Sequence, residues 1–426
     1  MVDIDLKIVK EAVVNSLIFA NTELSNEDYK ELTSYNSNIK NEIRKNAYLA
    51  KLTKRPLCQD TGLCIFFVEI GQEVHFINGD FEETVNEAVR ECYINNFYRK
   101  SVVKNAIFNR ENTKDNTPCI IHTKITKGDK VKILTAIKGG GAENMTRLKM
   151  MNPTSTIEDI IDFVKKTIDE AGENACPPMT IGVGIGGSSE YACLLAKYAI
   201  FKGEKLEGDF KNTVNVKMLT APCHIASLPV CININCHSLR HFEVEIDKNK
   251  ITYLTKLSNP KDIELNSNHK KINTSNLEEF KKLKKGDKIF LTGKIFTARD
   301  MAHKRLSSMI KNNEKLPFEI KNSIIFYAGP CPKKDNEIIG PIGPTTSKRM
   351  DKFAPLLYEK GVLATIGKGE RTLSGGNRLY FKAIGGIANV YKNCVKSQKP
   401  VCFEDLGTEA VVELEVIDMP LEVNVV

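Results

Sequence analysis

The chain has 426 residues, of which 42% are hydrophobic, and a formal net charge of +8. This length is typical of two domains with substantial cores, and the composition excludes a largely disordered protein. The positive charge is spread over lysine-rich stretches without interleaved aromatic residues, so we expect no nucleic-acid partner, whereas an anionic substrate would suit it.

The amino-terminal segment MVDIDLKIVKEAVV is amphipathic and carries acidic residues, unlike a signal or transit peptide. No apolar run is long enough to cross a bilayer, so we expect a cytoplasmic protein without a membrane partner. In a reducing compartment the 12 cysteines would not form a disulfide framework. Some of them should therefore bind metal or take part in chemistry, and the rest should fill cores.

Hydrophobic periodicity and turn residues predict alternating helices and strands. In the first part we expect strands over 129–138 and 179–187, a glycine turn at GGGAEN, and helices over 5–20, 26–52, 152–172 and 188–201. The composition becomes polar and charged between Asp247 and Lys288, where we place a domain boundary near residue 268. The second part is predicted to be α/β, with a helix over 297–313 and strands in 288–293, 323–330 and 380–391.

A glycine-rich stretch, GVGIGGSS, follows one predicted strand and precedes a predicted helix. It lacks the GxGxxG spacing of a dinucleotide-binding loop, and no acidic residue stands at the required place on a following strand. We therefore expect no dinucleotide site. An anion at the amino terminus of the following helix fits the pattern better.

Three cysteines stand in loops bounded by glycine or proline: Cys58 in PLCQDTG, Cys176 in ENACPP and Cys236 in NINCHSLRH. The chain has no CxxC pair and no C-x-x-H cluster, which argues against a small zinc module. Packing is the alternative to metal ligation for all three, because free cysteines are commonly buried. Three thiolates would leave one iron of a cubane cluster open, and an open iron can act as a Lewis acid.

The second part carries hydroxyls and cations in short polar motifs. GPTTSKRMD presents two threonines and Arg349 after a proline turn, FTARDMAHKR places Arg299 at a strand-to-helix junction, and IGKGE places Lys368 between glycines. A guanidinium bonds both oxygens of a carboxylate, although any one of these cations alone is compatible with an ordinary surface charge. Together with CQDTG and KGGGAEN, these motifs predict a site for a small dicarboxylate.

The chain resembles the class I, iron–sulfur fumarate hydratases and the related L-tartrate dehydratases over nearly its whole length. Seven motifs occur in the family's order: CQDTG, KGGGAEN, NACPPMTIGVGIGGSSE, PCHIASLPVCININCHSLRH, TARDMAHKR, FYAGPCP and GPTTSKRMD. In many relatives the two parts are separate α and β subunits, and here they look fused. The expected fold is α/β, with a mixed α+β cluster-binding domain over residues 1–268 and a swivelling-type, carboxylate-binding domain over residues 269–426. We also expect a homodimer.

The resemblance implies that Cys58, Cys176 and Cys236 bind a [4Fe–4S] cluster with one open iron. Another thiol, Cys223, stands in the same segment as Cys236, and we favour Cys236 because it occupies the family's cysteine position. The residues that match positions near the family's substrate are Gln59, Asp60, Arg99, Gly140, His224, Arg299, Thr345, Thr346, Arg349 and Lys368.

The implied activity is that of a hydro-lyase of the tricarboxylic acid cycle, the reversible hydration of fumarate to (S)-malate. The family assigns removal of the C3 proton to the Thr345 hydroxyl, with Asp60 as its activator or as the base itself, and His224 as a further catalytic residue. The closest alternatives, an L-tartrate dehydratase or a mesaconate hydratase, would use the same residues. A non-catalytic iron–sulfur sensor or a zinc-binding structural protein would not need the threonine, arginine and lysine set.

Overall fold

The computed structural model describes residues 1–265, 268–373 and 378–425. Packing divides the chain into two compact units. The first is Met1–Lys40 with Asp60–Asn259, and the second is Asn41–Gln59 with Pro260–Val426. Both contain helices and strands, which confirms the α/β class. The division at Asn259 precedes the boundary predicted near residue 268, and residues 41–59 join the second unit, so independent domains at 1–268 and 269–426 stay a prediction.

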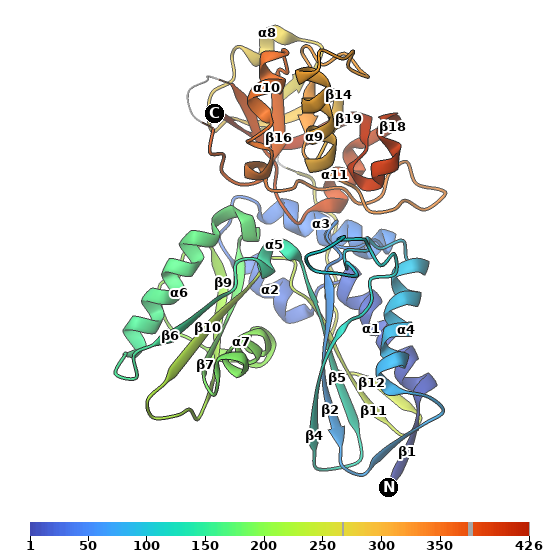
Figure 1. Cartoon of the computed structure of the whole chain (residues 1–426), viewed down its shortest axis with the longest axis vertical. Helices are drawn as coiled ribbons and strands as arrows, with labels where there is room; N and C mark the ends of the chain where they lie inside the picture. Colours follow the sequence, from blue (N-terminus) through green and yellow to red (C-terminus); the bar gives the residue numbers. More distant parts are fainter. Residues whose placement is uncertain (266–267, 374–377, 426) are drawn as a thin grey trace. The chain divides into compact units, whose positions relative to one another are not determined.

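The first unit contains two five-stranded sheets (Figure 1). One has the order β12-β11-β5-β2-β4, with β2 (Leu63–Gly71), β4 (Ile120–Thr126), β5 (Val131–Lys138), β11 (Arg240–Asp247) and β12 (Lys250–Tyr253). The other has the order β6-β10-β7-β9-β8, with β6 (Arg147–Met151), β7 (Met179–Gly186), β8 (Glu204–Lys205), β9 (Thr213–Ala221) and β10 (Leu228–Asn235). A small parallel pair joins β1 (Val2–Asp5) to β3 (Val74–Ile77).

Helices lie on and between these sheets, and they are α1 (Leu6–Thr22), α2 (Asn26–Ser34), α4 (Phe81–Asn95), α6 (Ile157–Ala171) and α7 (Ser189–Lys202), with the short α5 (Gly140–Glu143) and η1 (Gly172–Ala175). α1 and α4 pack on one face of the β2 sheet, and α6 packs on the β7 sheet. α7 lies between the sheets, because Tyr198 contacts the β2 sheet and Ala196 contacts the other. The apolar residues of the unit are thereby buried in successive layers.

The glycines of GVGIGGSS serve helix packing. A Cβ on Gly182 would lie 2.0 Å from the Ala196 carbonyl oxygen, and one on Gly184 would lie 2.1 Å from that of Ala192. Only strand residues without side chains let α7 approach β7 this closely. The helix amino terminus carries Glu190, whose carboxylate accepts the Ser188 hydroxyl at 2.6 Å, so an acidic group already occupies the place expected for an anion.

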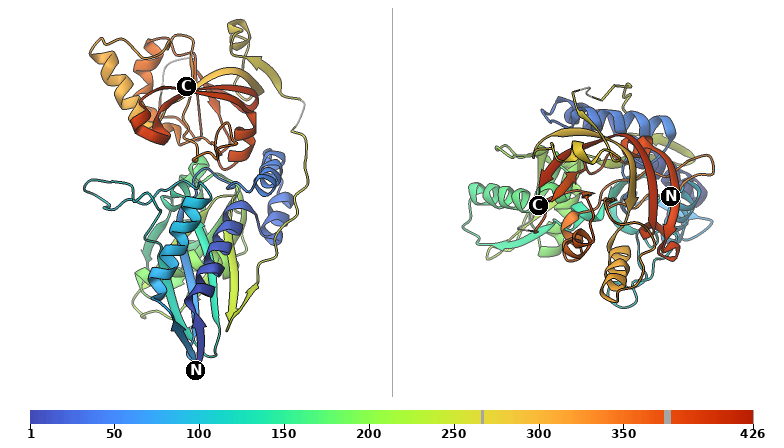
Figure 2. Two further views of the ribbon diagram at one scale, coloured as in Figure 1. Left: turned by 90° about the vertical axis from the view of Figure 1, so that its right-hand side faces the viewer. Right: turned by 90° about the horizontal axis from the view of Figure 1, so that it is seen from above.

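The second unit is built on a closed barrel, because β14 pairs with β15 on one side and with β19 on the other, and the order continues through β16 and β17 back to β19. The strands curve around a common axis (Figure 2). The barrel strands are β14 (Lys288–Thr297), β15 (Ile324–Phe326), β16 (Ala364–Gly367), β17 (Leu379–Lys382) and β19 (Val411–Val425), extended by β13 (Lys270–Asn273) and β18 (Val395–Cys402). The helices are α3 (Lys40–Thr53), α8 (Leu277–Phe280), α9 (Asp300–Lys311), α10 (Ala354–Glu359) and α11 (Ala388–Cys394), with η2 (Ser347–Met350) and η3 (Glu404–Glu409).

Most predicted elements are confirmed, including α1, β5, β7, α7, β14 and α9. α6 begins with a capping box between Thr156 and Asp159 and ends at Gly172, as its turn residues predict. The prediction of 380–391 without a helix is wrong from Ala388 onwards, where α11 begins. Two further expectations are wrong. The helix predicted over 26–52 is two helices, α2 and α3, because short polar residues in YNSN compete with the helical backbone for hydrogen bonds. GGGAEN begins the short helix α5 rather than a simple turn.

In the part of the chain that the structure describes, no helix is both long and apolar enough to span a membrane.

Candidate active site

Cys176 and Cys236 come together in the first unit. Cys176 precedes β7 and Cys236 follows β10, and the antiparallel register of these strands puts those two ends side by side. The His237 N–H donates to the Cys176 carbonyl at 3.3 Å. Burial and the neighbouring Cys176 raise the pKa of the Cys236 thiol, while the Arg240 and Lys138 cations act in the opposite direction. Two of the three predicted thiolate ligands are therefore neighbours.

Backbone groups hold the Asp60 carboxylate. Its Oδ2 accepts the Gly140 N–H at 2.8 Å, and its Oδ1 accepts the Gly62 N–H at 3.1 Å. The Arg240 guanidinium donates to the Asp60 carbonyl at 2.6 Å. Gly62 has φ +68°, and a Cβ there would lie 2.5 Å from the Lys138 carbonyl oxygen, so the turn requires glycine. The structure thus joins two predicted site residues, Asp60 and Gly140.

The KGGGAEN motif also supplies an ion pair between a buried lysine and a half-buried glutamate. Lys138 is 2% exposed, its ammonium donates to the Ile234 carbonyl, and it lies 3.8 Å from Glu143 Oε2. Burial lowers the pKa of Lys138 to about 8, against the opposing charge of Glu143. Burial raises the pKa of Glu143, but Lys138 and Lys197 outweigh it and hold that pKa below its ordinary value. Sequence reasoning missed Lys138 and Arg240, although both stand in motifs that it singled out.

Arg99 and His224 have different positions in the first unit. Arg99 starts the long loop at 99–119, which leaves the body of the unit in Figure 2, and its carbonyl accepts the Thr61 hydroxyl at 2.6 Å. His224 lies in the exposed loop between β9 and β10. β10 runs from that loop to Cys236. His224 and Cys236 are therefore roughly 25 Å apart, at about 3.3 Å per strand residue. The fold of one chain does not bring His224 to the cysteine pair, and its catalytic role stays a prediction.

In the second unit, the end of the PLCQ segment lies beside the GPTT turn. The Gln59 amide donates to the Pro344 carbonyl at 3.3 Å, and the Cys58 thiol donates to Gln59 Oε1 at 3.5 Å. A Cβ on Gly343 would lie 2.3 Å from the same Oε1, so the glycine permits this approach. Cys58 and Gln59 are therefore placed next to the turn that leads to Thr345.

Arg349 connects Thr345 with Asp300. The guanidinium binds the Asp300 carboxylate with two hydrogen bonds, from Nε at 3.1 Å and from Nη2 at 2.6 Å, and its Nη1 donates to Thr345 Oγ1 at 3.1 Å. Asp300 lies in the first turn of α9, and Arg349 lies in η2. Sequence reasoning selected Thr345 and Arg349 but missed Asp300, which follows Arg299 directly in TARDMAHKR.

The backbone pairs the threonine turn with the lysine loop. The Lys368 N–H donates to the Thr345 carbonyl at 3.1 Å, and Thr346 forms a parallel bridge with Lys368. Two more predicted residues, Thr346 and Lys368, therefore lie beside Thr345. The hydroxyls of GPTT and the lysine of IGKGE belong to one surface although they are about twenty residues apart in sequence.

Arg299 is the amino-terminal cap of α9 and is 7% exposed. Its Nη2 lies 3.4 Å from Glu409 Oε1. His303, one turn further along α9, donates from Nδ1 to the Arg299 carbonyl at 2.9 Å. Burial lowers the pKa of His303 to about 4, so its imidazole is neutral at pH 7. A neutral histidine can bond this carbonyl without adding a buried charge beside Arg299.

Within residues 1–265, 268–373 and 378–425, no three side chains of His, Cys, Asp or Glu form a ready metal-binding group. The donor chemistry of the first unit nevertheless fits two thiolate ligands, because Cys176 and Cys236 are neighbours and the Arg240 and Lys138 cations lower the pKa of the Cys236 thiol against its burial. Deprotonated thiols are what iron requires. Cys58 belongs to the second unit, two residues before Asp60 of the first.

Family models match almost the whole chain. The model described as fumarate hydratase (fumerase) matches residues 8–212 and 207–245, and the model described as fumarase C-terminus matches residues 241–426. The class I, anaerobic fumarate hydratase of Escherichia coli is 29% identical over 89% of this chain and 79% of its own length.

Two proteins of Methanocaldococcus jannaschii match the two parts separately. The first is provisionally named L(+)-tartrate dehydratase subunit alpha and is 33% identical over 55% of this chain and 93% of its own length. The second is provisionally named L(+)-tartrate dehydratase subunit beta and is 44% identical over 33% of this chain and 77% of its own length. The regions matched in this one chain thus correspond to two separately named subunits in that organism.

Proposed function

Because this chain belongs to the fumarate hydratase family and is a hydro-lyase, we propose that it catalyses the reversible hydration of fumarate to (S)-malate. The observation that carries the proposal is the contact of Arg349 Nη1 with Thr345 Oγ1 at 3.1 Å. A cationic donor at a hydroxyl oxygen stabilises that oxygen when it loses its proton. It therefore supplies what a threonine needs in order to act as a general base.

In the dehydration direction, the Thr345 hydroxyl first gives its own proton to an activating carboxylate, the role that the family gives Asp60, and Thr345 Oγ1 then takes the proton from C3 of malate. Arg349 stays paired with Asp300 during this step, so the guanidinium keeps its direction. A guanidinium has five N–H groups, and the contacts with Asp300 and Thr345 use three of them. The other two, one on each terminal nitrogen, can bind a substrate carboxylate, while Arg99, Arg299 and Lys368 offset the remaining negative charge.

Asp60 is the alternative base. Its carboxylate accepts two backbone N–H groups, which fix its direction while leaving lone pairs for a substrate proton. Gln59 and Gly140 would contact the substrate beside it, and Thr346 would stand next to Thr345. Thr345→Ala and Asp60→Asn distinguish the two bases, because exchange of the malate C3 proton should survive Thr345→Ala only if Asp60 is the base.

We further propose that Cys58, Cys176 and Cys236 hold a [4Fe–4S] cluster. The neighbouring thiols of the first unit support this assignment, together with the match to the family over the segments that contain all three. When bound, a cluster with an open iron supplies Lewis acidity that polarises the C–O bond of the leaving hydroxide.

The experiment is an anaerobic assay of reconstituted protein with fumarate, malate, mesaconate and both tartrates. The proposal expects the highest kcat/KM with fumarate and (S)-malate. A higher value with L-tartrate would replace it by the second candidate, an L-tartrate dehydratase. That candidate is favoured by identities of 33% and 44% to the two archaeal subunits. Inactivity towards all five acids with an intact cluster would contradict both and favour a non-catalytic iron–sulfur protein.

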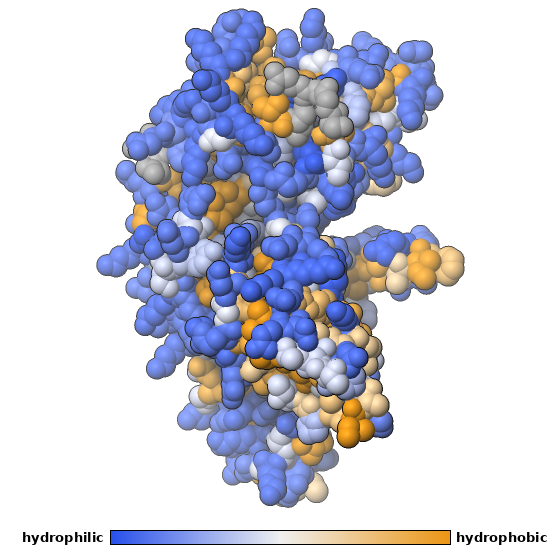
Figure 3. Space-filling model, turned by 90° about the vertical axis from the view of Figure 1, so that its left-hand side faces the viewer, coloured by the Kyte–Doolittle hydropathy of each residue, from blue (hydrophilic) through white to orange (hydrophobic). Residues whose placement is uncertain are grey.

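We also propose a homodimer, in which a second copy covers apolar side chains of the first unit. β6 is the last strand of its sheet, and its Leu148 and Met150 are 46% and 55% exposed. Ile225, in the loop before β10, is 91% exposed, and apolar patches mark the face that carries α6 and β6 (Figure 3). Light scattering should give twice the chain mass, and Met150→Lys should shift it towards one chain. A monomeric unaltered protein would contradict the proposal.

A further inference from the structure

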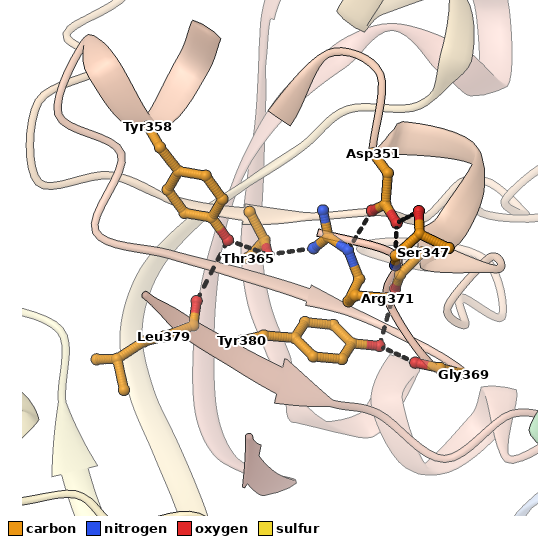
Figure 4. A network of polar contacts seen from close by, with 9 residues as sticks. Ser347, Asp351, Tyr358, Thr365, Gly369, Arg371, Leu379 and Tyr380 are labelled. Carbon is orange, nitrogen blue, oxygen red and sulfur yellow. Dashed lines mark hydrogen bonds and ion pairs between the residues drawn. The ribbon is translucent and has the colours of Figure 1, made fainter. Parts of the chain in front are cut away.

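We propose that four buried residues, Ser347, Asp351, Arg371 and Tyr380, are positioning residues that fix the loops carrying Thr345, Arg349 and Lys368. The inference deepens the proposed function and rests on it, because those loops matter only if their side chains act on substrate. None of the four would touch substrate. Figure 4 shows their contacts as one continuous group.

The first loop is held at both ends of η2, the short helix that contains Arg349. At its start, the Ser347 hydroxyl lies 2.9 Å from the Tyr380 hydroxyl, and Ser347 is fully buried. At its end, Asp351 forms an ion pair with Arg371. Arg349 therefore lies between two anchored residues and cannot rotate with the turn as a whole.

The second loop runs from Gly367 to Thr372 and contains Lys368. The Tyr380 hydroxyl donates to the Gly369 carbonyl at 2.8 Å, so the tyrosine contacts both loops. Further along, Thr372 donates to Asp351 Oδ2 through its N–H at 2.6 Å and its hydroxyl at 2.7 Å. Both anchors of this loop, at Gly369 and Thr372, follow Lys368 in sequence, whereas Arg349 has an anchored residue on each side.

Direct backbone contacts join the two loops between these anchors. The Ser347 N–H donates to the Lys368 carbonyl at 2.9 Å. A Cβ on Gly367 would lie 2.0 Å from Ser347 Oγ, so the loops are packed as closely as glycine allows. Removing one anchor should therefore move both loops.

Arg371 is the centre of the group. Its side chain is 0% exposed, Nη1 donates to Thr365 Oγ1 at 3.0 Å, and the guanidinium lies 5.5 Å from the Tyr327 ring and 5.2 Å from the Tyr380 ring. A buried ion pair is weak evidence for stability, because desolvation of both charges offsets their attraction. Here the ion pair fixes the orientation of the Arg371 and Asp351 side chains, because a planar guanidinium between two rings can adopt few orientations.

The test compares two tyrosines of the second unit, each of which would lose two polar partners as phenylalanine. Tyr380→Phe removes the contacts with Ser347 and Gly369. The control Tyr391→Phe removes contacts with the Ile384 N–H at 2.7 Å and the Pro420 carbonyl at 3.4 Å, outside both loops. We expect Tyr380→Phe to lower kcat by about 10-fold to 100-fold with a smaller change in KM, because a displacement of about 1 Å can cost this much. The control should change kcat less than threefold.

Hydrogen exchange gives a readout that does not depend on the substrate. In Tyr380→Phe, the amides of Ser347 and Lys368 should exchange faster than in the unaltered protein, with unchanged rates in the β14–β19 pair. Equal exchange and equal kcat in the two tyrosine variants would overturn the proposal. Faster exchange in a protein that hydrates no fumarate would instead leave the positioning role standing and refute the proposed substrate.

A second comparison separates position from stability. The double variant Asp351→Leu with Arg371→Met replaces the ion pair by apolar groups, which commonly preserves stability. We expect a thermal midpoint equal to or above that of the unaltered protein and kcat lowered at least 10-fold. Full activity in a stable double variant would overturn the role of the ion pair. If the double variant fails to fold, Arg371→Lys provides the same test, because it keeps the charge and loses the planar fork.

Discussion

The two units fix their charged site residues by different means. In the first unit, the Asp60 carboxylate is held by backbone N–H groups of Gly62 and Gly140. In the second, Arg349 is held by side chains, those of Asp300 and Thr345. Backbone donors are set by the turn that presents them, whereas a side-chain partner can be removed by one conservative substitution. Activity should therefore be sensitive to substitution of glycines in the first unit and of carboxylates in the second.

The largest expected effect is loss of the cluster. Cys176→Ser and Cys236→Ser should abolish visible cluster absorbance and activity, because a serine oxygen is a poor replacement for a thiolate on iron. Cys58→Ser should do the same. The controls are Cys64→Ser, at a fully buried position beside Tyr93, and Cys193→Ser, which should keep the absorbance. If Cys223→Ser loses the cluster and Cys236→Ser keeps it, the ligand assignment is wrong.

Substitution of the base should come next. Thr345→Ala should lower kcat by about 10²–10⁴-fold with little change in KM, because a base acts only as the proton leaves. Cluster absorbance should not change. Exchange of the malate C3 proton in deuterated water isolates the same step. Near-normal exchange in Thr345→Ala, with exchange lost in Asp60→Asn, would transfer the role from the second unit to the first.

The backbone-held carboxylate can be tested at Gly140. This residue is the first of α5 and follows Gly139 at φ −72° and ψ 141°, so proline is compatible with the local backbone. Gly140→Pro removes the N–H that Asp60 Oδ2 accepts, and kcat/KM should fall about 10-fold to 100-fold, the usual worth of a bond to a charged group. Gly140→Ala is the matched control, because it keeps that N–H. Equal losses in both variants would show that the side-chain volume, and not the donor, matters.

The side-chain-held cation can be tested at Asp300. Asp300→Asn removes the negative charge that orients Arg349, and kcat/KM should fall about 10-fold. The matched control is Asp405→Asn, because Asp405 also binds an arginine with two hydrogen bonds, from Arg305 at 2.7 and 2.5 Å. That variant should change kcat/KM less than twofold. A similar loss in both would indicate a general effect on the second unit.

Substitution of His303 should have the smallest effect on turnover. It should instead change how the stability of the second unit depends on pH. The pKa of His303 is about 4 in the folded chain and 6.5 as the ordinary value, so the unfolded chain binds the extra proton between these pH values. Stability of the second unit should therefore fall as the pH decreases from 6.5 to 4, by at most about 3 kcal/mol. His303→Asn should weaken this dependence in urea unfolding followed by hydrogen exchange. His75→Asn, at a side chain that is 58% exposed in the first unit, should leave it unchanged.

Local sequence predicted the elements whose stability is local. The apolar spacing of α1, the capping residues of α6 and the short run of β-branched and apolar residues in β5, which the structure buries on both faces, each specify one structure over neighbouring positions. The helix predicted over 26–52 failed at YNSN, where polar side chains favour a break that the periodicity on either side does not reveal.

The sequence by itself determined which residue types stand in the site motifs, and among them it selected Thr345, Arg349 and Lys368. Only the tertiary structure decided their partners. Asp300 reaches Arg349 across 49 positions, and Tyr380 reaches Ser347 across 33. The parallel order β14-β15-β16-β17 makes these contacts possible, because the segments that follow neighbouring parallel strands start at the same end of the barrel. The same dependence on pairing separates His224 from Cys236, since residues close in sequence lie at opposite ends of an extended strand.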